Sequence, residues 1–311
     1  MKYVILFIVV ILVAGVGAYT WYQHSSTPLS VEQADPEVPA VADDEDEIGE
    51  ETEADVDETP TTERGPQSTI GTSADGHAIS AYHFGTGETE LLFVGGIHGG
   101  YSFNTSLVAF QLIDQLNTNP ELVPDNITVT VIPVLNPDGA ERATGRTTRF
   151  SASHVTSDQA TRVASRFNTN DVDLNRNFDC EWQAQGTWQD RPVSGGDAPF
   201  SEPEAQAIRN YVATHRPAAA VVWYAAAGGV FASECRDGIL PETRTLLEQF
   251  AQASGYTAHD SFDFYAITGD MVNWLARENI PAISVLLTDR EDPEWSRNWN
   301  GIRAVINHYA R

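Results

Sequence analysis

Four short runs of apolar, often β-branched residues lie beyond residue 66, and each has the length of a strand rather than of a helix. They read ELLFVGGI (90–97), ITVTVIPVL (127–135), PAAAVVWYA (217–225) and PAISVLLT (281–288). Apolar runs without an alternating polar face are typical of strands that are covered on both sides. We therefore expect these four segments to form the buried strands of one sheet.

Amphipathic segments with helical spacing lie between or after these runs. They cover about 105–116, a segment that opens at Ser201, 241–254, 269–278 and 293–309. In the second of them, Ser201 and Glu204 have the spacing of a capping box, which predicts a helix start there. Strands that alternate with helices imply right-handed crossovers and a mainly parallel sheet, so residues 67–311 are predicted to form one α/β domain.

The N-terminal residues 1–25 form a separate apolar segment. Residues 3–22 supply the roughly 20 mostly apolar positions that a helix needs to cross a bilayer. One lysine precedes this stretch and acidic residues follow it, which places the rest of the chain outside the cytoplasm. Small residues such as Gly15 and Ala18 leave open a cleaved secretory signal. We predict a transmembrane anchor, with secretion as the alternative, and an extracytoplasmic domain in either case.

An acidic segment follows the anchor. Residues 26–66 contain fifteen of the 44 acidic residues of the chain, one of its 18 basic residues and almost no large apolar side chains. Such a segment cannot bury enough surface to fold, so we predict a disordered linker. The formal net charge of the whole chain is −26, and the part beyond the linker is acidic too. An acidic surface repels the phosphate backbone, which argues against nucleic acid as a partner.

Cys180 and Cys235 are the two cysteines of the chain. In an oxidising compartment an even pair of cysteines predicts a disulfide. The sequence does not give the geometry that a disulfide needs, so two buried free thiols remain the alternative.

Polar side chains follow the predicted strands, where sites form in open α/β sheets. In GGIHGGYS (95–102), His98 emerges from a strand between glycines, a common way to hold a metal or a substrate. In VDLNRNFDC (172–180), Asp173, Asn175 and Arg176 stand close together. A guanidinium beside an amide can bind a carboxylate through several hydrogen bonds, although a polar turn with a surface ion pair has the same composition.

Five segments, in their order and spacing, resemble the zinc carboxypeptidase family. They are GGIHGG (95–100), VIPVLNPDG (131–139), RFNTNDVDLNRNF (166–178), SGGDAPFSEPEAQAI (194–208) and FYAITGDMVNWL (264–275). The resemblance covers about residues 85 to 310. It implies a single α/β domain with a central mixed sheet. It also implies zinc-dependent removal of residues from peptide C-termini or trimming of cell-wall peptides.

The resemblance extends unevenly to the metal site. Family members bind zinc through an H-x-x-E motif and a later histidine, and His98 matches the first ligand. Tyr101, or Ser102 one residue further on, stands at the glutamate position, and Tyr224 at the second histidine. Leu286 replaces the general base. A neutral phenol is a poor zinc ligand and a leucine cannot accept a proton, so we expect no zinc cofactor and no intact catalytic residue.

The substrate-binding half of the family pattern is retained. Asn175 and Arg176 match the pair that binds the terminal carboxylate, and Arg166 matches the arginine that polarises the scissile carbonyl. Tyr265 matches the mobile tyrosine that closes over the substrate. Asp173 matches the carboxylate that orients the first histidine and is expected to pair with it.

Each of these residues also has a structural interpretation. His98 is alternatively a hydrogen-bonded buried histidine, the two arginines are members of structural ion pairs, and Tyr265 is a surface aromatic. Asp270, on the loop that lines the family's side-chain pocket, is expected either to select an ammonium-bearing side chain or to serve as a carboxylate at a helix N-terminus. Tyr101, Tyr224 and Leu286 are expected to fill the volume of the metal site.

The sequence therefore predicts a membrane-anchored, extracytoplasmic pseudoenzyme that binds peptide or cell-wall-peptide C-termini without hydrolysing them. One alternative is an active, zinc-dependent carboxypeptidase whose metal ligands come from unexpected positions. A second is a structural partner-binding domain. A third is a hydrolase that uses Ser102 as a nucleophile beside His98, which would require a hydrogen bond between the two and an oxyanion hole.

Overall fold

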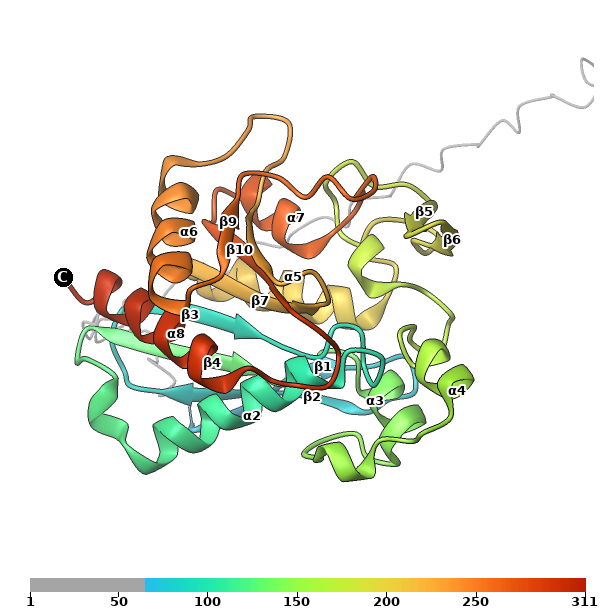
Figure 1. Cartoon of the computed structure of the whole chain (residues 1–311), viewed down its shortest axis with the longest axis horizontal. Helices are drawn as coiled ribbons and strands as arrows, with labels where there is room; N and C mark the ends of the chain where they lie inside the picture. The colour runs from blue at the N-terminus through green and yellow to red at the C-terminus, as the bar shows by residue number, and fades with distance from the viewer. Residues whose placement is uncertain (1–64) are drawn as a thin grey trace, which may run out of the picture. The chain divides into compact units, whose positions relative to one another are not determined.

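The structure is a computed structural model that describes residues 65–311 (Figure 1). Among these residues, no helix is both long and apolar enough to span a bilayer. The predicted anchor at residues 3–22 lies outside the described part of the chain, as does nearly all of the predicted linker at 26–66. Both therefore stay predictions.

An eight-stranded mixed sheet forms the centre of the domain, with strand order β1-β2-β4-β3-β7-β10-β8-β9. The strands are β1 (Gln67–Thr72), β2 (Ala78–Phe84), β3 (Thr89–Val94), β4 (Ile127–Ile132), β7 (Ala219–Ala225), β8 (Gly229–Ala232), β9 (Thr257–His259) and β10 (Ala282–Leu287). A separate hairpin consists of β5 (Gln185–Trp188) and β6 (Arg191–Ser194).

The four predicted strands are the four central ones, β4, β3, β7 and β10, which pair in parallel. Antiparallel pairing occurs between β1 and β2, between β2 and β4, and between β8 and β10. The predicted mainly parallel, mixed sheet is therefore confirmed. Because parallel strands end at the same edge of a sheet, the residues after β3, β7 and β10 meet at one edge.

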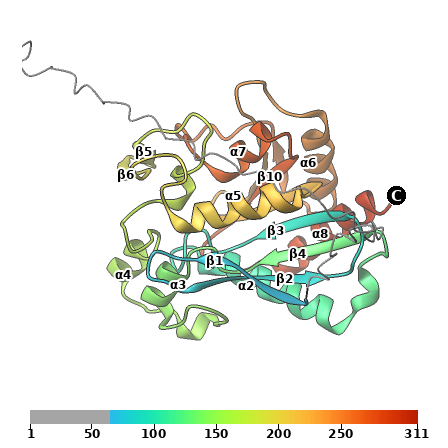
Figure 2. The same cartoon turned by 180° about the vertical axis from the view of Figure 1, so that it is seen from behind.

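Helices cover both faces of the sheet (Figures 1 and 2). They are α2 (Phe103–Thr118), α3 (Pro137–Thr144), α4 (Gln159–Ala164), α5 (Pro203–His215), α6 (Pro241–Ser254), α7 (Met271–Arg277) and α8 (Trp295–Tyr309), with 3-10 turns η1 (Pro120–Leu122), η2 (Ala152–His154) and η3 (Leu174–Arg176). All five predicted helices are present as α2, α5, α6, α7 and α8. The sequence analysis did not predict the short helices α3 and α4.

Alternation along the central strands creates two cores. In β7, Val221 and Trp223 point to one face, where they pack with apolar residues of α2, α6 and α8. Val222 and Tyr224 point to the other face, where they pack with residues of α5 and α7. Burial on both faces explains why these strands read as continuous apolar runs in the sequence. Tyr224 thereby reaches the face on which the candidate site lies.

The predicted capping box at α5 is wrong. The helix begins at Pro203 with Glu202 as its N-cap, and no side chain caps it. Glu204 instead accepts hydrogen bonds from the backbone N of Ala74 at 3.1 Å and from Nδ2 of Asn168 at 3.2 Å. Proline is favoured at the first helical position, so the helix begins at Pro203 rather than after Ser201. The Glu204 carboxylate, which the local pattern predicted to cap the helix, is bound by residues distant in the sequence.

The predicted disulfide between Cys180 and Cys235 is confirmed, with 6.1 Å between the two Cα atoms. It connects the segment after η3 to the loop that follows β8, and 55 positions of sequence separate its cysteines. Both cysteines are buried, and both line the cavity that is described next. The disulfide therefore fixes part of the wall of that cavity.

Candidate ligand-binding cavity

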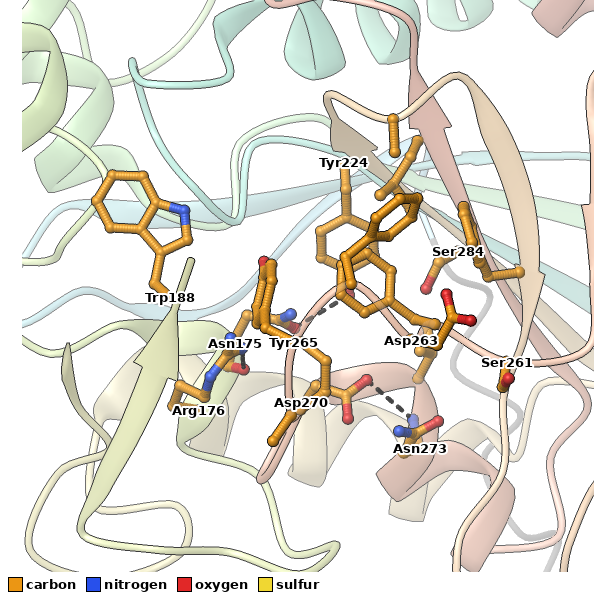
Figure 3. Close-up of a pocket in the computed structure, with 18 of the residues that line it drawn as sticks. Asn175, Arg176, Trp188, Tyr224, Ser261, Asp263, Tyr265, Asp270, Asn273 and Ser284 are labelled. Atoms are coloured by element: carbon orange, nitrogen blue, oxygen red, sulfur yellow. Dashed lines mark hydrogen bonds between the residues drawn. The ribbon is translucent and has the colours of Figure 1, made fainter. Parts of the chain in front are cut away.

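A cavity of about 1020 Å³ opens at the carboxyl edge of the central strands (Figure 3). Besides the two cysteines, eight residues that the sequence singled out line it together: His98, Arg166, Asn175, Arg176, Tyr224, Tyr265, Asp270 and Leu286. They come from the turn after β3, the turn after α4, the 3-10 turn η3, strands β7 and β10, and the loop before α7. Residues separated by almost two hundred positions in the sequence therefore share one cavity.

Glycines shape the turn that carries His98. Gly96 and Gly99 have φ angles of 68° and 46°, which glycine adopts at little cost. A Cβ atom on Gly99 would lie 2.5 Å from the carbonyl oxygen of Ser165. The turn therefore packs closely against the segment that leads to Arg166, and a larger residue would separate the two.

His98 is buried, with 4% of its surface exposed, and neither ring nitrogen has a hydrogen-bond partner among the described residues. The burial that the structural interpretation expected is confirmed, but no hydrogen bond of normal length accompanies it. Its Nε2 lies 3.5 Å from Oδ1 of Asp173, close enough for an ion pair if the ring is protonated, but too long for a good hydrogen bond. Burial, together with the nearby Arg166 guanidinium, lowers the pKa of His98 to about 4, so the ring is neutral at pH 7.

Asp173 is bound by Arg166, which donates from Nε at 3.0 Å and from Nη2 at 2.7 Å to the same oxygen, Oδ2. Burial alone would raise the pKa of Asp173, but the Arg166 charge holds it well below its usual range. The other oxygen, Oδ1, accepts from the backbone N of Asn175 and caps η3. Asp173, which was expected to orient His98, thus forms mainly an ion pair with Arg166. This agrees with the alternative interpretation of Arg166 as a member of a structural ion pair.

Arg176 has no carboxylate partner among the described residues, although it is 1% exposed. Its Nε and Nη2 donate to the carbonyl oxygen of Thr187 at 3.2 and 2.6 Å, and Nη1 donates to that of Asn175 at 2.6 Å. A guanidinium has five N–H groups, so two remain for a ligand. The ion-pair interpretation of Arg176 is therefore wrong, because its charge is held in place by neutral carbonyls.

Tyr224 and Leu286 are direct neighbours across β7 and β10. The Tyr224 hydroxyl donates to Oδ1 of Asn175 at 3.0 Å, and the same oxygen accepts from the backbone N of Met271 at 3.2 Å. Burial raises the pKa of Tyr224 well above its ordinary value, so the phenol stays neutral. At the position of the family's second histidine ligand there is thus a phenol whose proton is already donated to Asn175. At the position of the base there is an aliphatic side chain.

Asp270 and Tyr265 lie near Arg176 in Figure 3. Asp270 accepts at Oδ2 from the backbone N of Asn273 at 3.3 Å and caps α7, as the structural interpretation stated. It also lines the cavity, its Oδ1 has no partner among the described residues, and burial raises its pKa to about 6. The Tyr265 ring centroid lies 6.0 Å from the Arg176 guanidinium carbon. Tyr265 is therefore part of the cavity wall rather than an isolated surface aromatic.

Tyr101 and Ser102 are not among the residues that line the cavity. That Tyr101 fills the volume of the family's metal site therefore stays a prediction. Tyr101 packs edge-on against Trp188, with 5.1 Å between ring centroids. Ser102 is 1% exposed, and neither its hydroxyl nor the ring nitrogens of His98 have hydrogen-bond partners among residues 65–311. A nucleophilic Ser102 activated by His98 therefore lacks the hydrogen bond that this chemistry needs.

The side chains around His98 do not fit a zinc ion. A catalytic zinc site takes three protein ligands, and His98 is the one imidazole in the wall of the cavity. Asp173 is bound by Arg166, whose positive charge would also oppose a cation. Nowhere in residues 65–311 do three or more His, Cys, Asp or Glu side chains converge as a metal site requires.

Several residues of the cavity wall were missed by the sequence analysis. They include Trp188, Phe231, Phe262, Phe264, Glu234, Asp263 and Arg290. Rings of Phe231, Phe262 and Phe264 pack on one another, and Phe264 is 63% exposed. These residues lie in β5, in β8 and in loops, where no periodic pattern marked them. Clustered aromatics at positions 262–265 were the available signal for this part of the wall.

Residues 63–294 match the family model described as zinc carboxypeptidase. The chain belongs to this family. The matched segment contains every candidate residue discussed above, from His98 to Arg290.

One curated relative is gamma-D-glutamyl-L-diamino acid endopeptidase 1 of Lysinibacillus sphaericus. It is 24% identical over 216 residues, which cover 63% of this chain and 54% of that protein. The chain thus spans about half the length of this relative.

Two solved structures share the fold. Murein-tripeptide amidase MpaA from Escherichia coli O157 matches with a TM-score of 0.55 and 22% identity over 78% of this chain and 92% of its own. Bovine thrombin-activatable fibrinolysis inhibitor, in complex with tick carboxypeptidase inhibitor, matches with a TM-score of 0.63 and 16% identity over 78% and 89%. These likenesses support the zinc-carboxypeptidase-like fold.

Proposed function

We propose that this protein binds the C-terminus of a peptide in the cavity and does not hydrolyse it. The observation that carries the proposal is Arg176, a buried guanidinium without a carboxylate partner among the described residues. A carboxylate is the ligand that matches its fork of N–H donors, and such charge-assisted hydrogen bonds are strong when water is excluded. Arg176 is held by two carbonyl oxygens, so it is already positioned before a ligand arrives.

Absence of hydrolysis is proposed from the side chains that would have to perform it. Leu286 cannot take a proton from water, and the neutral Tyr224 hydroxyl is committed to Asn175. His98 lacks the partners that a zinc ion needs, as described above. With neither a polarising cation nor a base, a bound peptide would remain intact.

A cell-wall peptide is the ligand that we favour. One relative is named as a gamma-D-glutamyl-L-diamino acid endopeptidase and one structural neighbour as a murein-tripeptide amidase. The second name refers to a peptide of murein, the bacterial cell-wall polymer, and the first to a γ-D-glutamyl peptide bond. We further propose that the domain lies outside the cytoplasm, anchored through residues 3–22, where such peptides are found. The disulfide supports an oxidising compartment.

The proposal is tested by calorimetric titration of peptide pairs that differ in one group, a free C-terminal carboxylate or a C-terminal amide. We expect wild-type protein to prefer the free carboxylate by roughly 10- to 100-fold, the usual range for a charge-assisted hydrogen bond. Arg176→Gln should remove this preference. Arg303→Gln, on the exposed side of α8, is the matched control and should keep it.

Two outcomes would favour the alternatives. If Arg176→Gln binds its partner as tightly as wild type, the domain is a structural partner-binding module. If protein from zinc-supplemented medium retains stoichiometric zinc and releases C-terminal amino acids in a chelator-sensitive way, the chain is an active carboxypeptidase with unconventional metal ligands. We expect neither zinc retention nor release.

A further inference from the structure

Arg290 lines the same cavity, and among the described residues it has neither a hydrogen bond nor an ion pair. Its buried Nε atom lacks any partner. Arg290 is half-buried, so its outer nitrogens keep access to solvent, whereas the desolvated Nε without a partner is costly unless a ligand satisfies it. Among the described residues, the cavity therefore contains two buried or half-buried arginines with no carboxylate within ion-pair distance, Arg176 and Arg290.

The isolation of Arg290 does not result from a lack of acids nearby, because its sequence neighbours are acidic. Asp289 accepts backbone hydrogen bonds from Glu291 and Asp292 at 2.8 and 2.9 Å. Glu291 pairs with Arg162 at 2.6 Å, and Asp292 accepts from the backbone N of Glu294 at 2.8 Å. Every neighbouring carboxylate is directed elsewhere, which leaves the positive charge of Arg290 available.

The loop that carries Arg290 is anchored on both sides of it. Asn104, a fully buried residue of α2, donates from Nδ2 to the carbonyl oxygens of Asp289 and Asp292 at 2.9 and 3.0 Å. Thr288 donates from its hydroxyl and from its backbone N to the carboxylate of Glu294. These bonds hold the loop in one conformation, so the approach of Arg290 to the cavity is pre-organised.

The ring of Tyr101 packs against the guanidinium of Arg290. The ring centroid lies 4.6 Å from the guanidinium carbon of Arg290 and 5.8 Å from that of Arg166. Contact with a ring face stabilises a guanidinium but leaves its in-plane N–H groups free for an acceptor. The tyrosine at the family's acidic ligand position thus serves as a platform for positive charge.

We propose that Arg290 binds a second carboxylate of the ligand, in addition to the terminal one at Arg176. This inference rests on the proposed function, since it assigns a second contact to the same bound peptide. The ligand would carry a free carboxylate near its C-terminus. A γ-linked glutamate supplies one through its free α-carboxylate, and an α-linked glutamate supplies one through its side chain.

Four tripeptides with free C-termini test the proposal by calorimetry. The first pair is Ala-γ-D-Glu-Lys and the same peptide with the α-carboxylate of glutamate converted into an amide. The second pair is α-linked Ala-Glu-Lys and Ala-Gln-Lys. We expect wild type to bind the carboxylate member of the γ-linked pair roughly 10- to 100-fold more tightly than its amide. Arg290→Gln should remove this difference and leave affinity for the amide member unchanged.

Arg290→Lys, which keeps the charge but not the planar fork, should retain part of the preference and guards against a folding defect in the glutamine variant. Arg303→Gln should behave as wild type. A preference confined to the α-linked pair, and lost in Arg290→Gln, would still support the second carboxylate and assign it to a side chain. Equal affinities within both pairs, or a preference that survives Arg290→Gln, would overturn the proposal.

These results separate the two proposals. If free C-termini bind more tightly than C-terminal amides but the inner carboxylate has no effect, the second contact at Arg290 is wrong and the proposed function stands. If C-terminal amides bind as well as free C-termini, the proposed function itself fails, and the inference fails with it.

Discussion

Tyr224 illustrates at the residue scale how one side chain redirects the chemistry of a site. A histidine there would present a nitrogen lone pair, whereas the phenol donates its proton to Asn175 at 3.0 Å. The same Asn175 oxygen accepts from Met271 at the start of α7. The tyrosine thereby links β7, η3 and α7, and it stabilises the wall that a metal would otherwise organise. The residues expected to bind the substrate, such as Asn175 and Arg176, can be kept under such a replacement even though the residues that would react with it are lost.

Leu286→Glu restores the carboxylate at the position of the family's base but should not restore activity, because the zinc ligands would still be missing. We expect no release of C-terminal amino acids, with or without added zinc. Leu286 is 8% exposed, so the free energy of unfolding should fall by roughly 3 kcal/mol. Peptidase assays and urea unfolding measure the two effects, with Leu286→Met as control. Zinc-dependent turnover by the glutamate variant would contradict this account.

Asp270 should make ligand preference depend on pH. Because its pKa is raised to about 6, the carboxylate is mostly neutral at pH 5 and mostly ionised at pH 7.5. The preference for a peptide ending in lysine over one ending in norleucine should therefore grow between these pH values. Titration calorimetry at both measures it, and Asp270→Asn should give a small preference at each. A preference that is equally large in the asparagine variant would leave Asp270 with its capping role alone.

At the scale of elements, the fold was largely predictable because its signals are local. The four central strands are buried on both faces, so each reads as an uninterrupted apolar run. Five helices followed from apolar spacing. The start of α5 was mispredicted because Glu204 is bound by Ala74, 130 positions away, and no local pattern records such a partner.

The candidate site was predictable only in part, for the same reason. Residues at strand ends or in family-like motifs, such as His98 and Arg176, do converge. The role of Arg290 was not predicted, since its availability to a ligand depends on which partners the carboxylates of Asp289, Glu291 and Asp292 bind. It also depends on Asn104, which reaches the loop across 185 positions of sequence. Loop geometry set by distant hydrogen bonds leaves no periodic trace.

Glu204 gives α5 a pH-dependent attachment to the turn between β1 and β2. Burial raises its pKa to about 7, and Asp138 and Glu202 are the acids near it. The folded protein therefore keeps a proton that the unfolded chain releases near 4.5. The resulting stability is complete below pH 4.5 and is lost as the pH rises through about 7.

Urea unfolding at pH 5 and pH 8 tests this attachment. The shift corresponds to a loss of up to about 3 kcal/mol in wild type, whereas Glu204→Gln should lose correspondingly less. Both proteins are measured at both pH values, so that the other carboxylates cancel in the comparison. Equal losses in the two proteins would mean that Glu204 is ionised throughout this range.

At the scale of the whole molecule, the proposed location has its own test. Full-length protein should remain in the membrane fraction after a high-salt wash, because about 20 apolar residues embed irreversibly in a bilayer. A chain that begins at residue 26 should be recovered in the soluble fraction. If expression of the full-length gene yields a soluble product whose N-terminus begins near Ala18, residues 1–25 would instead be identified as a cleaved signal.

The wall of the cavity is built from residues that lie far apart in the sequence, from His98 to Arg290. A molecule held there contacts several of these segments at once and binds only the folded state, so its binding free energy adds to the stability of the domain. Occupancy should consequently raise the melting temperature even where nothing is cleaved. Candidate peptides can therefore be screened by thermal shift, without a reaction to follow.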